Sequence, residues 1–148
     1  MPTRPPRPEG MSWISPYLTV KDPAKSVEFY EKAFGFEKRD AMPGPDGKII
    51  HASLIWQDCV IMLGPEGACE SKTLSPATSG TSSPISLYVY TPDVDALFAR
   101  ATKAGAKEIS KPQTAFWGDR ICQLADPAGY IWCFATNVAD FDPSKAPF

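Results

Sequence analysis

The side chains of greatest chemical reactivity in this 148-residue chain are its single histidine, His51, and its four cysteines. An imidazole and a thiolate can act as base and nucleophile, or can bind a metal ion together. A nucleophilic cysteine needs a base, a cation or a helix N-terminus nearby to lower its pKa, and the sequence places none of these beside Cys133. His51 and Cys133 are therefore only weak candidates for catalytic residues, and a buried, inert Cys133 is the favoured interpretation.

The cysteines also bear on the cellular compartment and on metal binding. Cys59, Cys69, Cys122 and Cys133 include no C-x-x-C pair, so we expect free thiols in a reducing cytosol. A metal site built from these residues would need His51, Cys122, Cys133 and a carboxylate to converge. We keep that arrangement as a secondary alternative and predict no metal and no cofactor.

The elements that must position these residues begin with a strand predicted over residues 14–20. Asp22 is a favourable N-cap for a helix over residues 24–34, and Gly35 ends that helix. Further strands are predicted over residues 36–42, 48–56 and 59–63, separated by turn-forming residues.

The same order of elements then restarts. A strand is predicted over residues 85–91, and Asp93 caps a helix that Gly105 ends. Strands follow over residues 106–109, 119–125 and 130–135. A shift of 71 residues brings the two halves into register, pairing Ser15 with Ser86, Tyr17 with Tyr88, Asp22 with Asp93, His51 with Cys122 and Met62 with Cys133. Because the whole order recurs with these pairs, we infer an internal duplication.

The repeat predicts an α+β fold of two β-α-β-β-β modules, over residues 13–63 and 85–137. The Gly-, Ser-, Thr- and Pro-rich residues 64–84 are predicted to link them within a single domain over residues 12–139. Two flanking segments complete the chain: a disordered N-terminal lead-in over residues 1–11 and a C-terminal tail over residues 140–148.

Charge and hydropathy restrict the partners. The formal net charge is −2 and no Lys/Arg cluster is present, so nothing indicates binding to nucleic acid or to a membrane surface. The apolar runs are shorter than a bilayer span, and the N-terminal residues lack the apolar stretch of a signal peptide. We therefore expect a cytoplasmic protein.

Several of these motifs carry a family resemblance. PYLTVKD at residues 16–22 and SVEFYEKAFG at residues 26–35 resemble the vicinal oxygen chelate superfamily, as do WGDR at residues 117–120 and DPAGY at residues 126–130. This superfamily includes glyoxalase I, fosfomycin- and bleomycin-resistance proteins and extradiol dioxygenases. PGPDGK at residues 43–48, followed by His51, points to its PhnB-like subgroup, which tends to carry histidine where Tyr88 stands. The resemblance implies a glyoxalase-like fold, in which mixed sheets curl into half-barrels around a cup.

The resemblance also implies where a metal would bind. Metal-dependent members hold a divalent ion with up to four side chains in the cup, and the matching positions are Ser15, Met62, Ser86 and Cys133. Two hydroxyls, a thioether and one thiol do not match the nitrogen and anionic oxygen ligands that such ions take. We therefore expect a cup that works without metal.

The expected lining of the cup suits a small molecule that is aromatic or largely apolar. Strand alternation places Tyr17 on the face of Ser15 and Tyr88 on the face of Ser86. Arg120 is a candidate partner for an anionic group, or a structural residue paired with Asp119 or Asp126. The predicted ligand-binding residues are Ser15, Tyr17, His51, Met62, Ser86, Tyr88, Trp117, Arg120 and Cys133.

Three hypotheses about function follow. The first, which we favour, is a metal-independent small-molecule binding protein of the glyoxalase/bleomycin-resistance type. The second is a lyase, isomerase or dioxygenase that uses atypical metal ligands, or acid–base chemistry of His51 with Tyr17 or Tyr88. The third is a non-catalytic interaction module whose cup is filled by its own side chains. Because relatives often dimerise, we also expect a homodimer.

Overall fold

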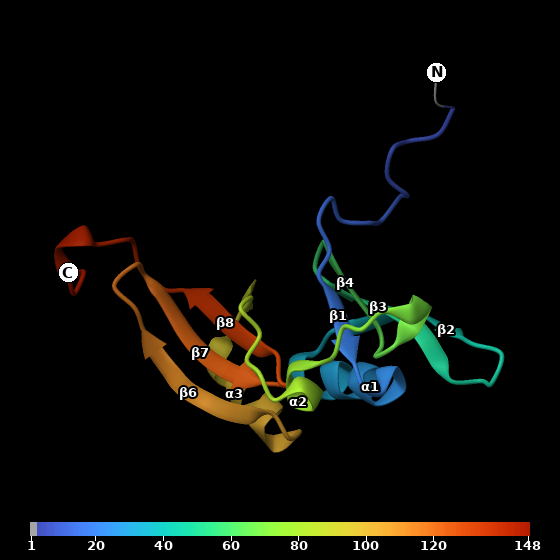
Figure 1. Ribbon diagram of the computed structural model, residues 1–148. Coiled ribbons are helices and arrows are strands. Elements are labelled where there is room, and N and C mark those ends of the chain that lie inside the picture. Colours follow the sequence, from blue (N-terminus) through green and yellow to red (C-terminus); the bar gives the residue numbers. More distant parts are fainter. Residues whose placement is uncertain (1–2) are drawn as a thin grey trace. The chain divides into compact units, whose positions relative to one another are not determined.

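A computed structural model describes residues 3–148 of the chain (Figure 1). The chain forms two compact units, each described below by itself. Unit one contains residues up to Glu31 together with Gly35–Ser75, and unit two contains Lys32–Phe34 together with Pro76–Phe148. No helix among the described residues is long and apolar enough to cross a membrane.

Unit one is built on a four-stranded mixed sheet in the order β1-β4-β3-β2. Its elements are β1 (Tyr17–Val20), α1 (Pro23–Phe34), β2 (Glu37–Pro43), β3 (Ile49–Trp56), β4 (Cys59–Pro65) and the 3-10 turn η1 (Ala68–Glu70). The caps are those predicted: the Asp22 carboxylate accepts a hydrogen bond from the Lys25 N–H at 3.2 Å, and Gly35 ends α1 with a φ of 74°.

Unit two repeats this architecture in the sheet order β5-β8-β7-β6. Its elements are α2 (Pro76–Ser79), β5 (Leu87–Tyr90), α3 (Val94–Lys103), β6 (Lys107–Thr114), β7 (Asp119–Ala125), β8 (Ile131–Asn137) and the 3-10 turn η2 (Pro143–Lys145). Asp93 caps α3 by accepting a hydrogen bond from the Ala96 N–H at 3.0 Å. In both units the first strand pairs in parallel with the last, so the predicted α+β fold with a duplicated module is confirmed.

Each sheet buries one face, and the alternation of side chains leaves the opposite face available. In unit one Leu18, Val20, Leu54 and Leu63 are buried. In unit two Leu124, Trp132 and Phe134 are buried, and α3 contacts β6, β7 and β8. We call the other side of each sheet its open face. In unit one it carries Tyr17, His51, Ser53 and Met62, and in unit two Tyr88, Tyr90, Asp119, Ile121 and Cys133.

The register of the hairpins corrects one part of the predicted repeat. Cys122 pairs with Phe134 and is fully buried, as Ala52 pairs with Leu63 and is fully buried. Cys122 therefore corresponds to Ala52, and the prediction that it shares the face of His51 is wrong.

The cause is the length of the second hairpin loop. The Asp126 N–H donates to the Tyr130 carbonyl at 3.1 Å, so residues 127–129 join β7 to β8 where residues 57–58 join β3 to β4. The extra residue changes the repeat shift along β7, so Ile121, not Cys122, corresponds to His51.

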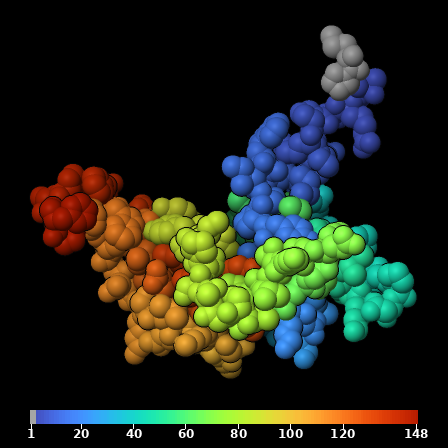
Figure 2. Space-filling view, in the orientation of Figure 1, coloured from blue at the N-terminus to red at the C-terminus, as the bar shows by residue number. Residues whose placement is uncertain are grey.

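The segment predicted as a linker contains two short helical turns, η1 and α2, and most of its side chains are exposed. Figure 2 shows it in light green at the molecular surface. The Glu66 N–H donates to the Val20 carbonyl at 3.0 Å, and the Ala77 N–H donates to the Ala128 carbonyl at 2.8 Å. Within the segment, the Ser75 hydroxyl donates to the Glu66 carboxylate at 2.8 Å. Residues 3–16 contain no helix or strand, and residues 1–2 of the predicted lead-in lie outside the described residues.

The buried position of Cys122 can be tested by thiol labelling. In a variant with Cys59→Ser and Cys69→Ser, which removes the exposed thiols, we expect almost no reaction with Ellman's reagent in the native state and reaction of both remaining cysteines in urea. The unmodified chain, in which Cys59 and Cys69 are exposed, is the control. Fast labelling of Cys122 in the folded variant would contradict the register.

Candidate functional site

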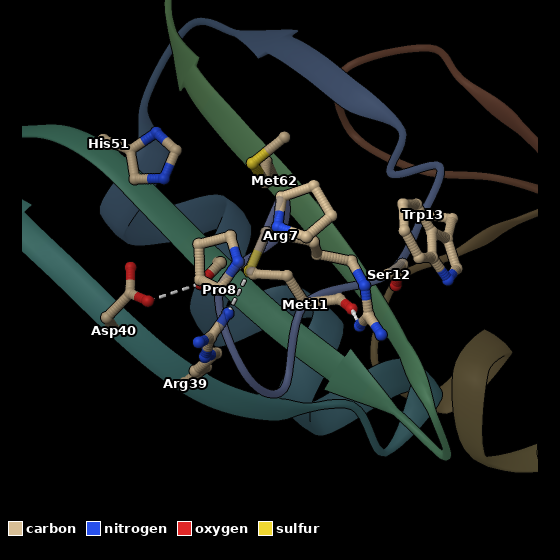
Figure 3. Close-up of a pocket in the computed structure, with 11 residues that line it drawn as sticks. Arg7, Pro8, Met11, Ser12, Trp13, Arg39, Asp40, His51 and Met62 are labelled. Carbon is tan, nitrogen blue, oxygen red and sulfur yellow. Dashed lines mark hydrogen bonds between the residues drawn. The ribbon is translucent and has the colours of Figure 1, made fainter. Parts of the chain in front are cut away.

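The open face of unit one gathers three of the predicted ligand-binding residues. Tyr17 is in register with Met62, and its ring centroid lies 5.9 Å from that of His51. His51 and Met62 line a cavity of about 500 Å³. Figure 3 shows them beside residues of the N-terminal segment and of β2.

A β-bulge brings two charged residues to this cavity. The pairing of β2 with β3 shifts between Lys38 and Asp40, so Arg39 and Asp40 both line the cavity although they are consecutive. Asp40 accepts a hydrogen bond from the Ser53 hydroxyl at 2.6 Å, and the Arg39 guanidinium contacts the Met11 sulfur. The bulge adds a polar wall to a face whose predicted lining suited an aromatic or largely apolar ligand.

The N-terminal segment supplies the rest of the cavity wall. Pro6, Arg7, Pro8, Met11, Ser12 and Trp13 line it. The Arg7 guanidinium lies 4.7 Å from the Trp13 ring centroid, and the Ser12 hydroxyl accepts a hydrogen bond from the Val60 N–H at 2.7 Å. Trp13 nevertheless remains 75% exposed, so this part of the wall is open to solvent.

Glycine at position 64 leaves the room that Tyr17 occupies. A Cβ at Gly64 would collide with the Tyr17 hydroxyl and would lie 3.4 Å from the Ile50 carbonyl oxygen. The Tyr17 ring is half exposed, so it would give way before the backbone did. Gly64 therefore helps to set the position of the Tyr17 ring beside His51.

The open face of unit two carries a polar aromatic cluster around Asp119. The Asp119 carboxylate is only 2% exposed and accepts hydrogen bonds from the hydroxyls of Tyr88 at 2.7 Å and Tyr90 at 2.8 Å. The Asn137 amide donates to its other oxygen at 2.9 Å, and the Trp117 indole N–H donates to the Tyr88 hydroxyl at 3.2 Å. One buried anion thus holds groups from β5, β8 and the loop before β7.

These hydrogen bonds separate the pKa values of the cluster. Burial alone would raise the pKa of Asp119, but hydrogen bonds from Asn137, Tyr88, Tyr90 and Trp117 outweigh it and hold the pKa below its ordinary value. Burial and the hydrogen bond to Asp119 raise the pKa of Tyr88, and the hydrogen bond to Asp119 raises the pKa of Tyr90. At neutral pH the cluster is a carboxylate surrounded by neutral donors.

The loop that carries Trp117 has a constrained backbone. Gly118 has a φ of 96°, and a Cβ there would collide with the backbone carbonyl of Ala139. The Gly118 carbonyl also accepts hydrogen bonds from the N–H groups of Val138 at 2.9 Å and Ala139 at 3.0 Å. This close approach fixes the backbone next to Trp117.

Neither buried cysteine has the properties of a nucleophile. Burial and the nearby Asp119 charge raise the pKa of Cys133, and burial raises the pKa of Cys122 to about 11. Thiolates are therefore scarce at both positions at neutral pH.

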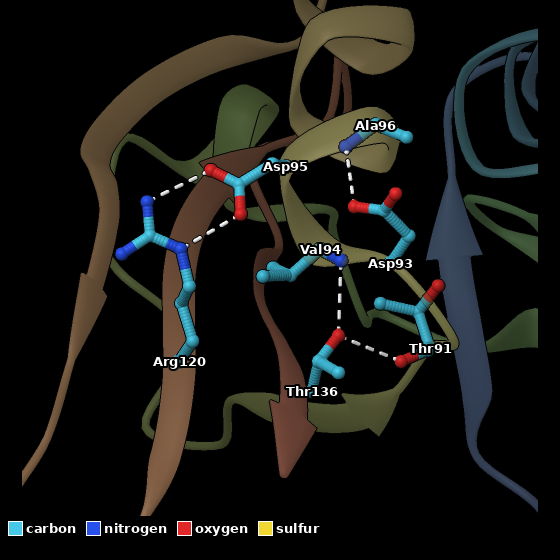
Figure 4. A network of polar contacts seen from close by, with 7 residues as sticks. All are labelled: Thr91, Asp93, Val94, Asp95, Ala96, Arg120 and Thr136. Carbon is cyan, nitrogen blue, oxygen red and sulfur yellow. Dashed lines mark hydrogen bonds and ion pairs between the residues drawn. The ribbon is translucent and has the colours of Figure 1, made fainter. Parts of the chain in front are cut away.

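Arg120 forms an ion pair that the sequence analysis did not predict. Its Nε and Nη2 atoms donate to the two oxygens of Asp95 at 2.7 and 2.8 Å, as Figure 4 shows. The same figure shows the Thr136 hydroxyl between the Thr91 carbonyl and the Val94 N–H, which links β8 to α3. Asp95 lies on α3, so the partners suggested from sequence, Asp119 and Asp126, are not those observed.

The two predicted serines differ in their surroundings. The Ser15 hydroxyl oxygen is buried and has no hydrogen-bond partner among residues 3–148, whereas Ser86 is exposed. Of the predicted ligand-binding residues, Tyr17, His51 and Met62 come together in unit one, and Tyr88, Trp117 and Cys133 in unit two. The ligand contacts of all of them remain predictions.

Sequence reasoning missed Asp119 and Asn137 as members of the cluster. The position of Tyr90 follows from strand alternation, since it lies two residues after Tyr88 on the same strand face. Asp119 and Asn137 form a direct cross-strand pair between β7 and β8. That pairing follows only once the hairpin register is known.

Comparison with known proteins identifies the family. The family described as Glyoxalase/Bleomycin resistance protein/Dioxygenase superfamily matches residues 10–134, and the chain belongs to this superfamily. The uncharacterized protein Mb0911c of Mycobacterium bovis is 37% identical over 129 residues, which cover 86% of this chain and 84% of that protein.

Solved structures agree with this assignment. TioX from Micromonospora sp. ML1 is similar with a TM-score of 0.69 and 30% identity, over 86% of this chain and 99% of TioX. TnmS3, an antibiotic binding protein from Streptomyces sp. CB03234, has the same fold with a TM-score of 0.62 and 23% identity, over 84% and 95% of the two chains. The predicted superfamily is therefore confirmed.

The role of Gly64 can be tested by NMR. Because His51 is the only histidine, its ring signals are unambiguous in protein that lacks a histidine tag. We expect Gly64→Ala to displace the Tyr17 ring and to shift the His51 ring protons in the same direction as Tyr17→Leu, which removes the ring current. Unchanged His51 signals in Gly64→Ala, with a clear shift in Tyr17→Leu, would contradict this role.

Proposed function

We propose that this chain is a metal-independent small-molecule binding protein of the glyoxalase/bleomycin-resistance type. We further propose that it is PhnB-like, acts in the cytoplasm as a homodimer, and binds a ligand that is aromatic or largely apolar. The observation that carries the proposal is the chemistry of the side chains at the positions where the superfamily binds metal.

Those side chains do not fit a divalent metal. Ser15 and Ser86 offer neutral hydroxyls and Met62 a thioether, all weak donors for zinc, nickel or manganese. Cys133 is the one donor that can become anionic, and its raised pKa opposes this. Among residues 3–148, no three His, Cys, Asp or Glu side chains gather where they could hold a metal ion.

The open faces have the composition of a ligand-binding surface. Tyr17 and Tyr88 are about half exposed, and in unit two Trp117 is 38% exposed and donates a hydrogen bond to the Tyr88 hydroxyl. Such rings offer large contact areas with polar tips that fix the orientation of a ligand. The same fold binds an antibiotic in TnmS3, which supports a similar role for this chain.

The enzyme hypothesis finds less support in the same residues. Acid–base chemistry at Tyr88 would need a pKa near neutrality, and Asp119 moves that pKa in the opposite direction. Nucleophilic chemistry at Cys133 meets the same objection.

Metal independence can be tested on protein purified without a histidine tag or chelator. We expect elemental mass spectrometry to find far less than one metal per chain, also after incubation with Zn, Ni, Mn and Fe salts. Near-stoichiometric metal would contradict the proposal. Hits from a thermal-shift screen of aromatic metabolites and antibiotics should then bind with equal affinity with and without EDTA.

Tyr88→Ala distinguishes a binding surface from an interaction module filled by its own side chains. Because Tyr88 is 46% exposed, we expect a small change in melting temperature and a loss of roughly tenfold or more in affinity for any hit from that screen. Val89→Ala, on the opposite face of β5, is the control and should keep the affinity. A large drop in melting temperature with unchanged affinity would favour the filled module.

A further inference from the structure

The Asp119 cluster contains a negative charge without a cation to balance it. Asp119 is 2% exposed, and its partners are the neutral groups of Asn137, Tyr88, Tyr90 and Trp117. Among residues 3–148, no lysine or arginine forms an ion pair with it. A buried charge of this kind is normally paired, so a ligand can supply the missing partner.

The groups around this charge are exposed aromatic rings. Tyr88, Tyr90 and Trp117 are 46%, 58% and 38% exposed. The Tyr88 and Tyr90 centroids lie 5.6 Å apart with an angle of 64° between the ring planes, so the rings present differently oriented surfaces. The carboxylate lies at the hydroxyl ends of Tyr88 and Tyr90, which donate to it directly, and Trp117 donates to the Tyr88 hydroxyl.

We propose that this cluster, formed by Tyr88, Tyr90, Trp117 and Asp119, binds the cationic group of a small organic ligand, such as an aryl- or alkylammonium. The inference rests on the proposed small-molecule binding function and adds the charge class of the ligand. The aromatic faces contact the cation and the buried carboxylate supplies the counter-charge.

The arrangement favours an organic cation over other ligands. A metal ion requires direct oxygen ligands, but both Asp119 oxygens already accept hydrogen bonds and no second carboxylate joins the cluster. An anion would meet the Asp119 charge at close range in a partly dehydrated site. A diffuse, weakly hydrated cation loses little hydration on contact with aromatic faces.

The hydrogen bonds also strengthen the aromatic surface. A phenol that donates to a carboxylate carries more electron density in its ring, which increases the attraction of the ring face for a cation. Both Tyr88 and Tyr90 donate to Asp119, so two rings gain from one charge. Because the raised pKa values keep both hydroxyls protonated, this state persists through neutral pH.

The test uses two probes of nearly equal shape that differ in charge, 3-hydroxyphenyltrimethylammonium and 3-tert-butylphenol, at pH 6.5. Binding to the full chain is followed by the indole N–H signal of Trp117 in proton–nitrogen NMR spectra, assigned with Trp117→Phe. We expect the cation to shift this signal and to bind about tenfold or more tightly than the neutral probe.

Two variants and a control locate the preference. Asp119→Asn should reduce the preference for the cation about tenfold. Glu108→Gln removes the same charge from an exposed position on β6 and should leave the preference unchanged. Glu108 is in register with Leu124, which belongs to the buried face of the sheet and not to the open face. Should Asp119→Asn fail to fold, Trp117→Leu, at a position that is 38% exposed, should weaken binding of the cation severalfold, with amide signals of β5 as the readout.

Three outcomes would overturn the inference. Equal affinity for the two probes, with the Trp117 signal shifted by both, would leave small-molecule binding intact but reject a cation site. A preference unchanged by Asp119→Asn and Trp117→Leu would place the cation elsewhere. Absence of any shift at Trp117 up to millimolar cation would also reject the site. None of these outcomes rejects the proposed function, which is tested separately by the metal analysis and the ligand screen.

Discussion

The hydrogen bonds accepted by the Asp119 carboxylate organise the open face of unit two. They tie Tyr88 and Tyr90 of β5 to Asn137 of β8, and through Tyr88 they reach the Trp117 loop. A single buried anion thereby decides which way these side chains point, and it keeps the tyrosines protonated. At neutral pH the Asp119 carboxyl is ionised, whereas the Tyr88 hydroxyl and the Cys133 thiol are protonated, a state that agrees with the recognition role proposed above.

The two units keep the same buried face and differ on the open one. Their sheet order, helix N-caps and apolar cores correspond, as duplication requires. On the open faces, His51 corresponds to Ile121, and Met62 to Cys133. Unit one adds a bulge with Arg39 and Asp40 and a cavity bounded by the N-terminal segment, and unit two adds the aromatic cluster. Substitutions on the open faces leave the packing of the helices untouched, so these faces can specialise independently.

Local signals in the sequence predicted most of the fold. Asp22, Asp93 and Gly35 marked helix ends correctly because capping depends on neighbouring residues alone. The strand faces of Tyr17 and Tyr88 followed from alternation. The position of Cys122 did not, because one extra residue in the loop after β7 changes the register of the whole strand. The partner of Arg120 was missed for a related reason: Asp95 is distant in sequence and approaches only when α3 packs on the sheet. Asp119 was considered only as a partner of Arg120, because the residues that it does bond come from three separate segments.

The most direct measurement is a pH titration of Asp119 and Tyr88 by carbon NMR, using the side-chain carboxyl carbon of Asp119 and the Cζ atom of Tyr88 in selectively labelled protein. If Asp119 is an anion held by neutral donors, its carboxyl carbon should titrate below the ordinary aspartate pKa of about 3.9, and Tyr88 should remain protonated beyond its ordinary pKa of about 10. The stability that Asp119 contributes would then be present above its ordinary pKa and be lost as the pH falls through its lowered value. An Asp119 carboxyl that titrates above its ordinary value, or a Tyr88 that ionises below its own, would contradict the proposed anionic cluster and the recognition role built on it.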